Sequence, residues 1–466
     1  MNPLKKLASQ TAIYGLSSVI GRLLNYLLVP LYTRYFLPAE YGVVTELYAY
    51  VAFLVVMLTY GMETSFFRFS KKEETIKVYS TTLISLLISS AVFISLIFLN
   101  SSAISQWLGY ANYPEYIQFF ALIIGMDAVA SISFAKLREQ DKAMRFAFIR
   151  IINIMVNIGL NLYFIIYQEY GIAYIFIANL VASAITLVML FPEMISSSWI
   201  FDKKLWKKMM IYALPLLIAG LAGMTNETID RILLKYLLPN TDMAASELGL
   251  YGAFYKLSII MILFIQTFRF AAEPFFFAQE KEESGRKIYA DVMKYFIIIM
   301  AIIFLGVTIF YDVIKGFLGS KYHDERGFLV VSILLLANLF LGIYYNLSIW
   351  YKLTGKTKYG AYLSIFGAII TLSLNFTLIP VLGFIGCAWA TLVCYFSMTV
   401  ASYYLGKRYF SVPYQVKRIL LYLFGMLCVY FCIYFTNSNM WINSLFLLGF
   451  VIFVFCLENP KLALKL

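Results

Sequence analysis

The longest stretches without a charged residue constrain this chain more than any other feature of its sequence. Three of them cover Val78–Pro114, Tyr359–Gly406 and Ile419–Leu457, with 37, 48 and 39 residues. A helix needs about 20 apolar residues to cross the hydrocarbon core of a bilayer, so each stretch is too long for one crossing. Polar or turn-forming residues interrupt all three, at Asn100-Ser-Ser102, Pro380-Val-Leu-Gly383 and Thr436-Asn-Ser-Asn439. We therefore expect helical hairpins at these places, the first completed by the apolar stretch after Glu115.

The composition agrees with a membrane protein. Apolar residues make up 62% of the chain and charged residues 13%, against about 45–50% and about 25% in soluble domains. These values exclude an ordinary soluble enzyme, a disordered chain and a disulfide scaffold; the five cysteines all lie in apolar segments. We expect an all-α, polytopic membrane protein with about fourteen transmembrane helices, near 10–33, 42–66, 78–99, 116–135, 146–168, 171–191, 209–233, 248–272, 291–314, 328–350, 360–380, 383–405, 417–435 and 440–457.

The distribution of basic residues predicts the orientation. With the amino terminus in the cytoplasm, 26 of the 37 lysines and arginines fall in cytoplasmic segments and five in outer loops. Such an excess marks the cytoplasmic side of a membrane protein. We expect both termini in the cytoplasm, and this distribution accounts for the net charge of +12 without nucleic acid as a partner.

An internal duplication organises the chain. A shift of 201 residues places Tyr35-Phe-Leu37-Pro38 on Tyr236-Leu-Leu238-Pro239, Glu46 on Glu247 and Asn25 on Asn226. Slightly larger shifts, of 214 and 212 residues, place Leu160-Asn161 on Leu374-Asn375 and Gly171 on Gly383. We expect two copies of one six-helix unit, residues 1–202 and 203–410, followed by two additional helices in 411–466. Both copies then enter the membrane from the same side, as in transporters built from parallel repeats.

Charged residues inside the spans are the candidate functional residues, because a charge at the bilayer centre is costly. Arg22 lies in the first span with Asn25 one turn away, and Arg231 and Lys256 lie in the first two spans of the second half. These four are the candidate substrate-binding residues of a cavity between the halves, where cations attract phosphate. For Arg231 and Lys256 the alternative is a side chain that extends to the outer interface.

Acidic residues in the spans are candidates for ion coupling. Asp127 lies at the centre of the fourth span, where it is either a coupling site or a protonated core residue. Glu227 and Asp230 lie beside Arg231, and the spacing of Glu227 and Arg231 also fits an intrahelical ion pair. Arg150, Arg269 and Lys294 lie near cytoplasmic ends, where headgroup anchoring is the expected role.

Catalytic patterns are missing from the sequence. Its one histidine, His323, falls in an expected outer loop, and no zinc-ligand spacing, phosphate-binding glycine loop or nucleophile elbow occurs. We expect a protein that is not an enzyme, with no resident cofactor and no metal site.

Two segments resemble a known family. Residues 7–18 (LASQTAIYGLSS) with 29–42 (VPLYTRYFLPAEYG) resemble the first helix of the Wzx-like polysaccharide flippases, and 374–390 (LNFTLIPVLGFIGCAWA) resembles their eleventh-to-twelfth helix turn. The superfamily also contains the MATE drug exporters and the lipid II flippases. The resemblance extends over the first twelve spans.

The resemblance implies a function. A flippase of this kind moves a polyprenyl-pyrophosphate-linked oligosaccharide from the cytoplasmic to the outer leaflet of a bacterial inner membrane, by alternating access coupled to H⁺ or Na⁺. Its products serve O-antigen, capsule or exopolysaccharide biosynthesis, and membrane lipids and polysaccharide polymerase machinery are the expected partners. We expect a monomer, because twelve helices suffice to enclose a pathway. The alternatives are a MATE-like drug exporter and a membrane-embedded oligosaccharide polymerase or ligase.

Overall fold

The computed structural model describes residues 21, 23, 24, 26–239, 241–278, 285–436 and 440–458. Secondary structure in these ranges is helical, without strands. Eleven of the described helices are long and apolar enough to cross a membrane, or twelve if the bent pair Met243–Leu257 and Ile259–Phe270 forms one span. Another apolar helix, Ala173–Met189, coincides with the sixth expected span, and most of the first expected span lies outside the described residues. The all-α, polytopic architecture is confirmed.

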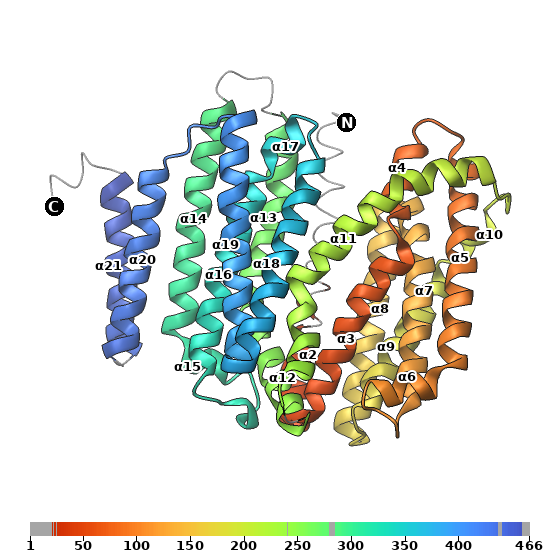
Figure 1. Ribbon diagram of the computed structural model, residues 1–466, viewed down its shortest axis with the longest axis horizontal. Helices are drawn as coiled ribbons and strands as arrows, with labels where there is room; N and C mark the ends of the chain where they lie inside the picture. The colour runs from red at the N-terminus through yellow and green to blue at the C-terminus, as the bar shows by residue number, and fades with distance from the viewer. Residues whose placement is uncertain are drawn as a thin grey trace. The chain divides into compact units, whose positions relative to one another are not determined.

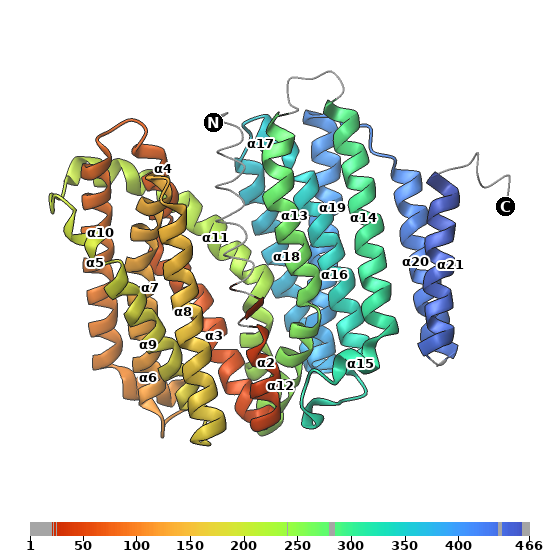
Figure 2. The same ribbon diagram turned by 180° about the vertical axis from the view of Figure 1, so that it is seen from behind.

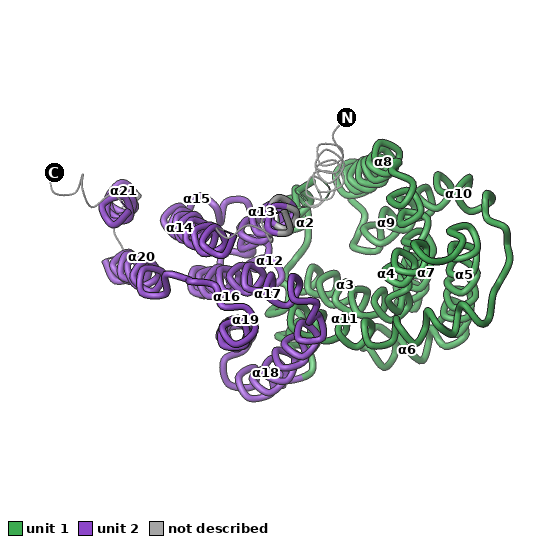
Figure 3. The backbone as a smooth tube through the Cα atoms, turned by 90° about the horizontal axis from the view of Figure 1, so that it is seen from above, with its two compact units in different colours: residues 1–236, 240–249 green, residues 237–239, 250–466 purple. Residues whose placement is uncertain are grey.

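The backbone divides into two compact units, residues 1–236 with 240–249 and residues 237–239 with 250–466 (Figure 3). The first unit holds most of the helices before residue 250 (Figure 1), with these bounds: α2 Leu28–Tyr35, α3 Pro38–Thr59, α4 Met62–Phe69, α5 Thr75–Leu99, α6 Ser101–Trp107, α7 Pro114–Glu139, α8 Ala143–Leu162, the π-helical turn η1 Tyr163–Tyr167, α9 Ala173–Met189, α10 Phe191–Ile195, α11 Lys203–Leu237 and the first part of α12 Thr241–Leu257. By packing, most of α11 therefore belongs with the first unit, whereas the duplication assigns it to the second half.

The second unit contains the remaining helices, which Figure 2 shows from behind. Their bounds are α13 Ile259–Ala278, α14 Gly285–Ile309, α15 Tyr311–Lys315, the 3₁₀ turn η2 Ser320–Tyr322, α16 Gly327–Leu347, α17 Ile349–Leu353, α18 Lys358–Leu382, α19 Phe384–Tyr409, α20 Val416–Thr436 and α21 Met440–Glu458. The duplication boundaries at 202 and 410 stay a prediction from the sequence.

Each unit is built around a few buried helices. In the first unit, 67% of the most apolar segment of α7 is buried, against 22% of the corresponding segments of α5 and α8. In the second, α14, α16 and α19 are the buried helices. The outer helices expose large apolar side chains, among them Leu96, Met155, Phe424 and Leu445. Exposed apolar surface along helices of spanning length is what lipid contact requires, so the chain is a multi-pass membrane protein.

The predicted turns lie where the sequence places them. Gly383 separates α18 from α19 with a φ of 57°, a left-handed conformation that glycine adopts without strain. A Cβ atom on Gly386 would lie 2.7 Å from the carbonyl carbon and oxygen of Leu378, so this hairpin needs glycine at both positions. The first long stretch breaks at Asn100 between α5 and α6; in the third, α20 ends at Thr436 and α21 begins at Met440, and residues 437–439 of the expected turn lie outside the described residues.

Asp202 caps the start of α11. Its Oδ1 accepts hydrogen bonds from the backbone N–H groups of Lys204 and Leu205 at 2.8 and 2.9 Å, and its Oδ2 lies 2.7 Å from Lys77 Nζ. The hydrogen bond from Lys77, followed by that from the Leu205 N–H, lowers the pKa of Asp202 to about 2. Because this folded-state pKa is depressed, the stabilisation is present above the ordinary pKa of about 3.9 and is lost as the pH falls toward 2.

We expect Asp202→Ala to lower the melting temperature of the purified protein at pH 7, by a few degrees at most. The difference from wild type should shrink as the pH falls from 4 toward 2. Asp202→Asn is the matched control, since it keeps a capping acceptor and loses only the charge. Equal melting temperatures for Asp202→Ala and wild type at pH 7 would contradict the assignment.

Candidate functional site

The polar face of α11 carries three of the predicted residues within the first unit. Asp230 is buried, and its Oδ1 accepts the backbone N–H of Arg231 at 2.8 Å. Arg231 is half-buried, and its guanidinium lies within electrostatic reach of the Tyr41 hydroxyl on α3. Glu227 is exposed on this helix. Its intrahelical ion pair with Arg231, considered from the spacing of the two residues, stays a prediction.

Asp127 lies in a second polar group formed by α7, α8 and α9. Its half-buried carboxyl interacts with the hydroxyl of Ser183 and with the positive charge of Arg150. The Arg150 guanidinium lies 4.2 Å from the ring centroid of Phe134 and 5.7 Å from that of Phe146. Asp127 thus has a cationic neighbour that its own helix does not supply. Arg150 is an exposed residue whose guanidinium also lies over these two core rings, and its expected role as a headgroup anchor stays a prediction.

The other predicted residues are distributed over different parts of the chain. Lys256 is half-buried near the end of α12, in the second unit. Arg22 and Asn25 lie outside the described residues. The structure therefore groups Asp230 with Arg231 on one helix, and places Asp127 in a separate group of the same unit. A cavity shared by the four candidate substrate-binding residues remains a prediction.

A buried ion pair that sequence reasoning missed joins α3 to α11. The carboxylate of Glu46 is 1% exposed and accepts two hydrogen bonds from Lys235 Nζ, at 3.0 Å to Oε1 and 2.9 Å to Oε2. The same ammonium donates to the carbonyl oxygen of Leu108 at 2.6 Å. The Tyr110 hydroxyl donates to Glu46, and the Tyr110 ring centroid lies 4.1 Å from Lys235 Nζ.

Two further tyrosines complete this group, the Glu46–Lys235 cluster, which consists of Glu46, Tyr50, Tyr110, Lys235 and Tyr236. Tyr50 interacts with Glu46, and the hydroxyls of Tyr50 and Tyr236 lie 2.9 Å apart. Burial, and then the Glu46 carboxylate, raise the pKa of Tyr110, which keeps its hydroxyl a donor. The match of Glu46 with Glu247 in the duplication was the signal that could have identified this carboxylate.

A row of asparagines along α8 was also missed. Asn153, Asn157 and Asn161 recur every four residues and so share one face. Asn153 donates to the Thr186 hydroxyl at 2.9 Å, and Asn161 donates to the side-chain oxygen of Asn157 at 2.9 Å. Asn161 also accepts a hydrogen bond from the Tyr32 hydroxyl at 2.9 Å. These hydrogen bonds connect α2, α8 and α9 and give the polar side chains of the three helices partners among themselves.

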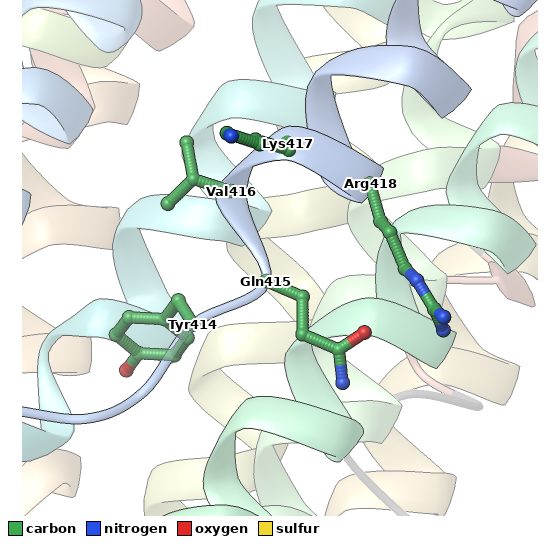
Figure 4. A pocket seen from close by; sticks show the side chains of 5 residues that line it. All are labelled: Tyr414, Gln415, Val416, Lys417 and Arg418. Atoms are coloured by element: carbon green, nitrogen blue, oxygen red, sulfur yellow. The ribbon is translucent and has the colours of Figure 1, made fainter.

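The second unit has a shallow pocket at the start of α20 (Figure 4), lined by Tyr414, Gln415, Val416, Lys417 and Arg418. Its lining is one continuous segment, and Arg418 Nη1 lies 3.6 Å from Glu458 Oε1. An open hollow made by five consecutive residues does not enclose a substrate, so it is not the candidate site.

A family model described as polysaccharide biosynthesis protein matches residues 7–278, more than half of the chain. The chain belongs to this polysaccharide biosynthesis family. The match covers all the described residues of the first unit, including α11 and the Glu46–Lys235 cluster. No curated protein matches the sequence significantly.

Solved structures of transporters have the same fold as this chain. A structure titled lipid II flippase MurJ, inward closed conformation, matches with a TM-score of 0.75 and 16% identity, over 96% of this chain and 99% of that one. An inward-facing multidrug resistance MATE transporter of the MOP superfamily matches with a TM-score of 0.68 and 14% identity, over 85% of this chain and 94% of that one. A MOP superfamily transporter from Pyrococcus furiosus matches with a TM-score of 0.56 and 13% identity, over 87% of this chain and 94% of that one.

Proposed function

We propose that this protein is a flippase that moves a polyprenyl-pyrophosphate-linked oligosaccharide from the cytoplasmic to the outer leaflet of a bacterial inner membrane, for the synthesis of a cell-surface polysaccharide. One observation carries the proposal: a chain of the polysaccharide biosynthesis family matches, over 96% of its length, the fold of a structure titled as a lipid II flippase. The MATE exporter fits less of the chain and with a lower TM-score, which favours a lipid-linked substrate over a drug.

The charge distribution supports an anionic headgroup as cargo. A pyrophosphate needs cations on its way through the hydrocarbon core, and arginine binds phosphate through two parallel hydrogen bonds. Arg231 is half-buried within a span-length helix, with Asp230 directly before it and Asn226 five residues earlier, about one and a half turns away. In this proposal Arg22, Asn25, Arg231 and Lys256 bind the headgroup, and Asp127, Glu227 and Asp230 are the acidic residues available to a coupling proton or sodium ion.

Depletion of the protein tests the proposal. Lipid-linked glycans would be extracted from depleted cells, assigned to a leaflet by their accessibility in intact cells and in inverted vesicles, and identified by mass. Accumulation on the cytoplasmic leaflet is the expected result, and the mass would identify the repeat unit. Glycan on the outer leaflet that stays unpolymerised would point to a polymerase or ligase. Normal glycans together with drug sensitivity would point to an exporter.

We expect Arg231→Gln to reduce glycan export about 10- to 100-fold, because one charge-assisted contact contributes about 1.5–3 kcal/mol. Arg231→Lys should retain more activity than Arg231→Gln, and less than wild type, because lysine keeps the charge without the bidentate geometry. Lys315→Gln is the control, since Lys315 is an exposed lysine paired with Asp312 in α15. Abundance in the membrane is measured in parallel, and wild-type export by Arg231→Gln would remove Arg231 from the site.

A further inference from the structure

We propose that the Glu46–Lys235 cluster, together with a glycine crossing next to it, forms the gate that closes the transport pathway on the outer side, as that side is predicted from the distribution of basic residues. This inference rests on the proposed function, because a gate requires a pathway with alternating access. It assigns a role to Glu46, Lys235, Gly42 and Gly249, none of which is among the predicted site residues.

The cluster joins three separate segments at one point. Glu46 comes from α3, Lys235 from the last turn of α11, and Tyr110 from the loop between α6 and α7. The three N–H donors of the Lys235 ammonium can be assigned to the two Glu46 oxygens and the Leu108 carbonyl. A contact in which every ammonium donor has a partner is either made or broken as a whole, which is the behaviour that a gate needs.

The backbones of α3 and α12 cross beside the cluster without side chains between them. A Cβ atom on Gly42 would lie 2.1 Å from the carbonyl oxygen of Ala245, and one on Gly249 would lie 1.8 Å from the carbonyl oxygen of Pro38. Gly42 precedes Glu46 by one helical turn, so the crossing and the ion pair share one face of α3. The close approach of the α3 and α12 backbones excludes water at the crossing. The neighbouring ion pair holds α3 to α11.

The duplication indicates that the ion pair joins the two repeats. The shift of 201 residues that places Glu46 on Glu247 also places Arg34 on Lys235. Each repeat therefore carries a base at the end of its first helix and an acid in its second helix. In the structure, the base of the second repeat pairs with the acid of the first. A bond between repeats at one end of the helices must break when that end opens, whereas a bond within one repeat need not.

A reporter cysteine tests the gate in the full-length protein. The five native cysteines are first replaced, and Thr228→Cys is introduced. Thr228 is buried and lies seven residues before Lys235, two turns away on the same face of α11. A membrane-impermeant maleimide is applied to either side of the membrane separately. An open gate exposes position 228 to the predicted outer side.

With the gate intact, labelling of Thr228→Cys from that side should be slow. Lys235→Gln leaves the Glu46 carboxylate without its cation, and we expect labelling to rise at least about tenfold, because an unpaired buried charge strongly favours the hydrated state. The exchanged pair Glu46→Lys with Lys235→Glu should return labelling to within about twofold of the original rate. Lys315→Gln is the charge control, and Tyr113→Cys, in an exposed loop, reports reagent access.

An unchanged labelling rate in Lys235→Gln, with normal labelling of Tyr113→Cys, would overturn the proposal. If Lys235→Gln does not fold, the double variant Tyr50→Cys with Tyr236→Cys provides the second measurement. Bridging these two positions with a cleavable bifunctional thiol reagent should stop export until the bridge is cut, and undiminished export by the bridged protein would also overturn the gate. Labelling needs no substrate, so the gate and the proposed function can fail separately. If labelling rises in Lys235→Gln but depletion of the protein leaves the glycans unchanged, the proposed function is refuted and the gate is not.

Discussion

Alanine at Gly249 is expected to stop export almost completely. Its Cβ would lie 1.8 Å from the oxygen and 2.6 Å from the carbon of the Pro38 carbonyl, and a backbone group cannot rotate away as a side chain can. The crossing of α3 and α12 would have to widen. Overpacking of this kind costs about 1–3 kcal/mol or more, which lowers the population of the closed state about 5- to 150-fold. Gly42→Ala should act in the same direction, because its Cβ would meet the Ala245 carbonyl oxygen at 2.1 Å.

Export of lipid-linked glycan and labelling of the Thr228→Cys reporter measure this effect together. Gly223→Ala is the matched control, because Gly223 is also a helical glycine of the first unit and its Cβ would meet no atom within 4 Å. That substitution should leave export unchanged and stabilise α11 by up to about 1 kcal/mol. Equal export by Gly249→Ala and Gly223→Ala would show that the close crossing is not needed for transport.

Methionine at Lys294 is expected to loosen the last two helices from the second unit. Lys294 is buried on α14, and its Nζ lies 2.5 Å from Glu458 Oε2 at the end of α21 and 3.9 Å from Asp291 Oδ1. The other Glu458 oxygen accepts the hydroxyl of the fully buried Tyr422 on α20. Removal of the lysine leaves a largely buried carboxylate without its main cation, at a cost of about 3 kcal/mol. Export should fall only if α20 and α21 take part in transport.

Hydrogen exchange of the backbone in α20 and α21 measures this loosening. A cost of about 3 kcal/mol corresponds to exchange that is faster by about a hundredfold, confined to these helices. Lys287→Met on the same face of α14, two turns earlier and exposed, is the control and should leave exchange unchanged. If hydrogen exchange in α20 and α21 is as slow in Lys294→Met as in wild type, apolar packing alone holds these two helices.

The sequence predicts the fold well where the signal is local. The length of an apolar stretch and the residue that interrupts it identify a hairpin, and Gly383 lies at its turn because only glycine adopts that backbone without strain. The second expected span, 42–66, is less regular than its hydropathy suggests. It divides into α3 and α4 at Tyr60 and Gly61, which both have positive φ. Hydropathy reports how apolar a segment is, not where its backbone bends.

The site is predicted less well because its contacts are distant in sequence. Glu46 and Lys235 are 189 residues apart, and each alone reads as a charge near the end of a span. Lys294 was expected to anchor headgroups, and this prediction is wrong, because its partner Glu458 follows 164 residues later. The pair of Glu227 and Arg231, one of the two alternatives for this spacing, stays a prediction, and the Glu227 side chain lies on an exposed face of α11.

The short helix α9 has a consequence for the surrounding lipid. It has 17 residues, whereas its neighbour α7 has 26. At about 1.5 Å per residue, α9 extends over about 26 Å, a few ångströms less than a hydrocarbon core of about 30 Å. Hydrophobic mismatch of this size is relieved by thinning the bilayer, at a fraction of a kcal/mol per ångström. Beside α9, the two leaflets should therefore lie closer together than elsewhere around the protein.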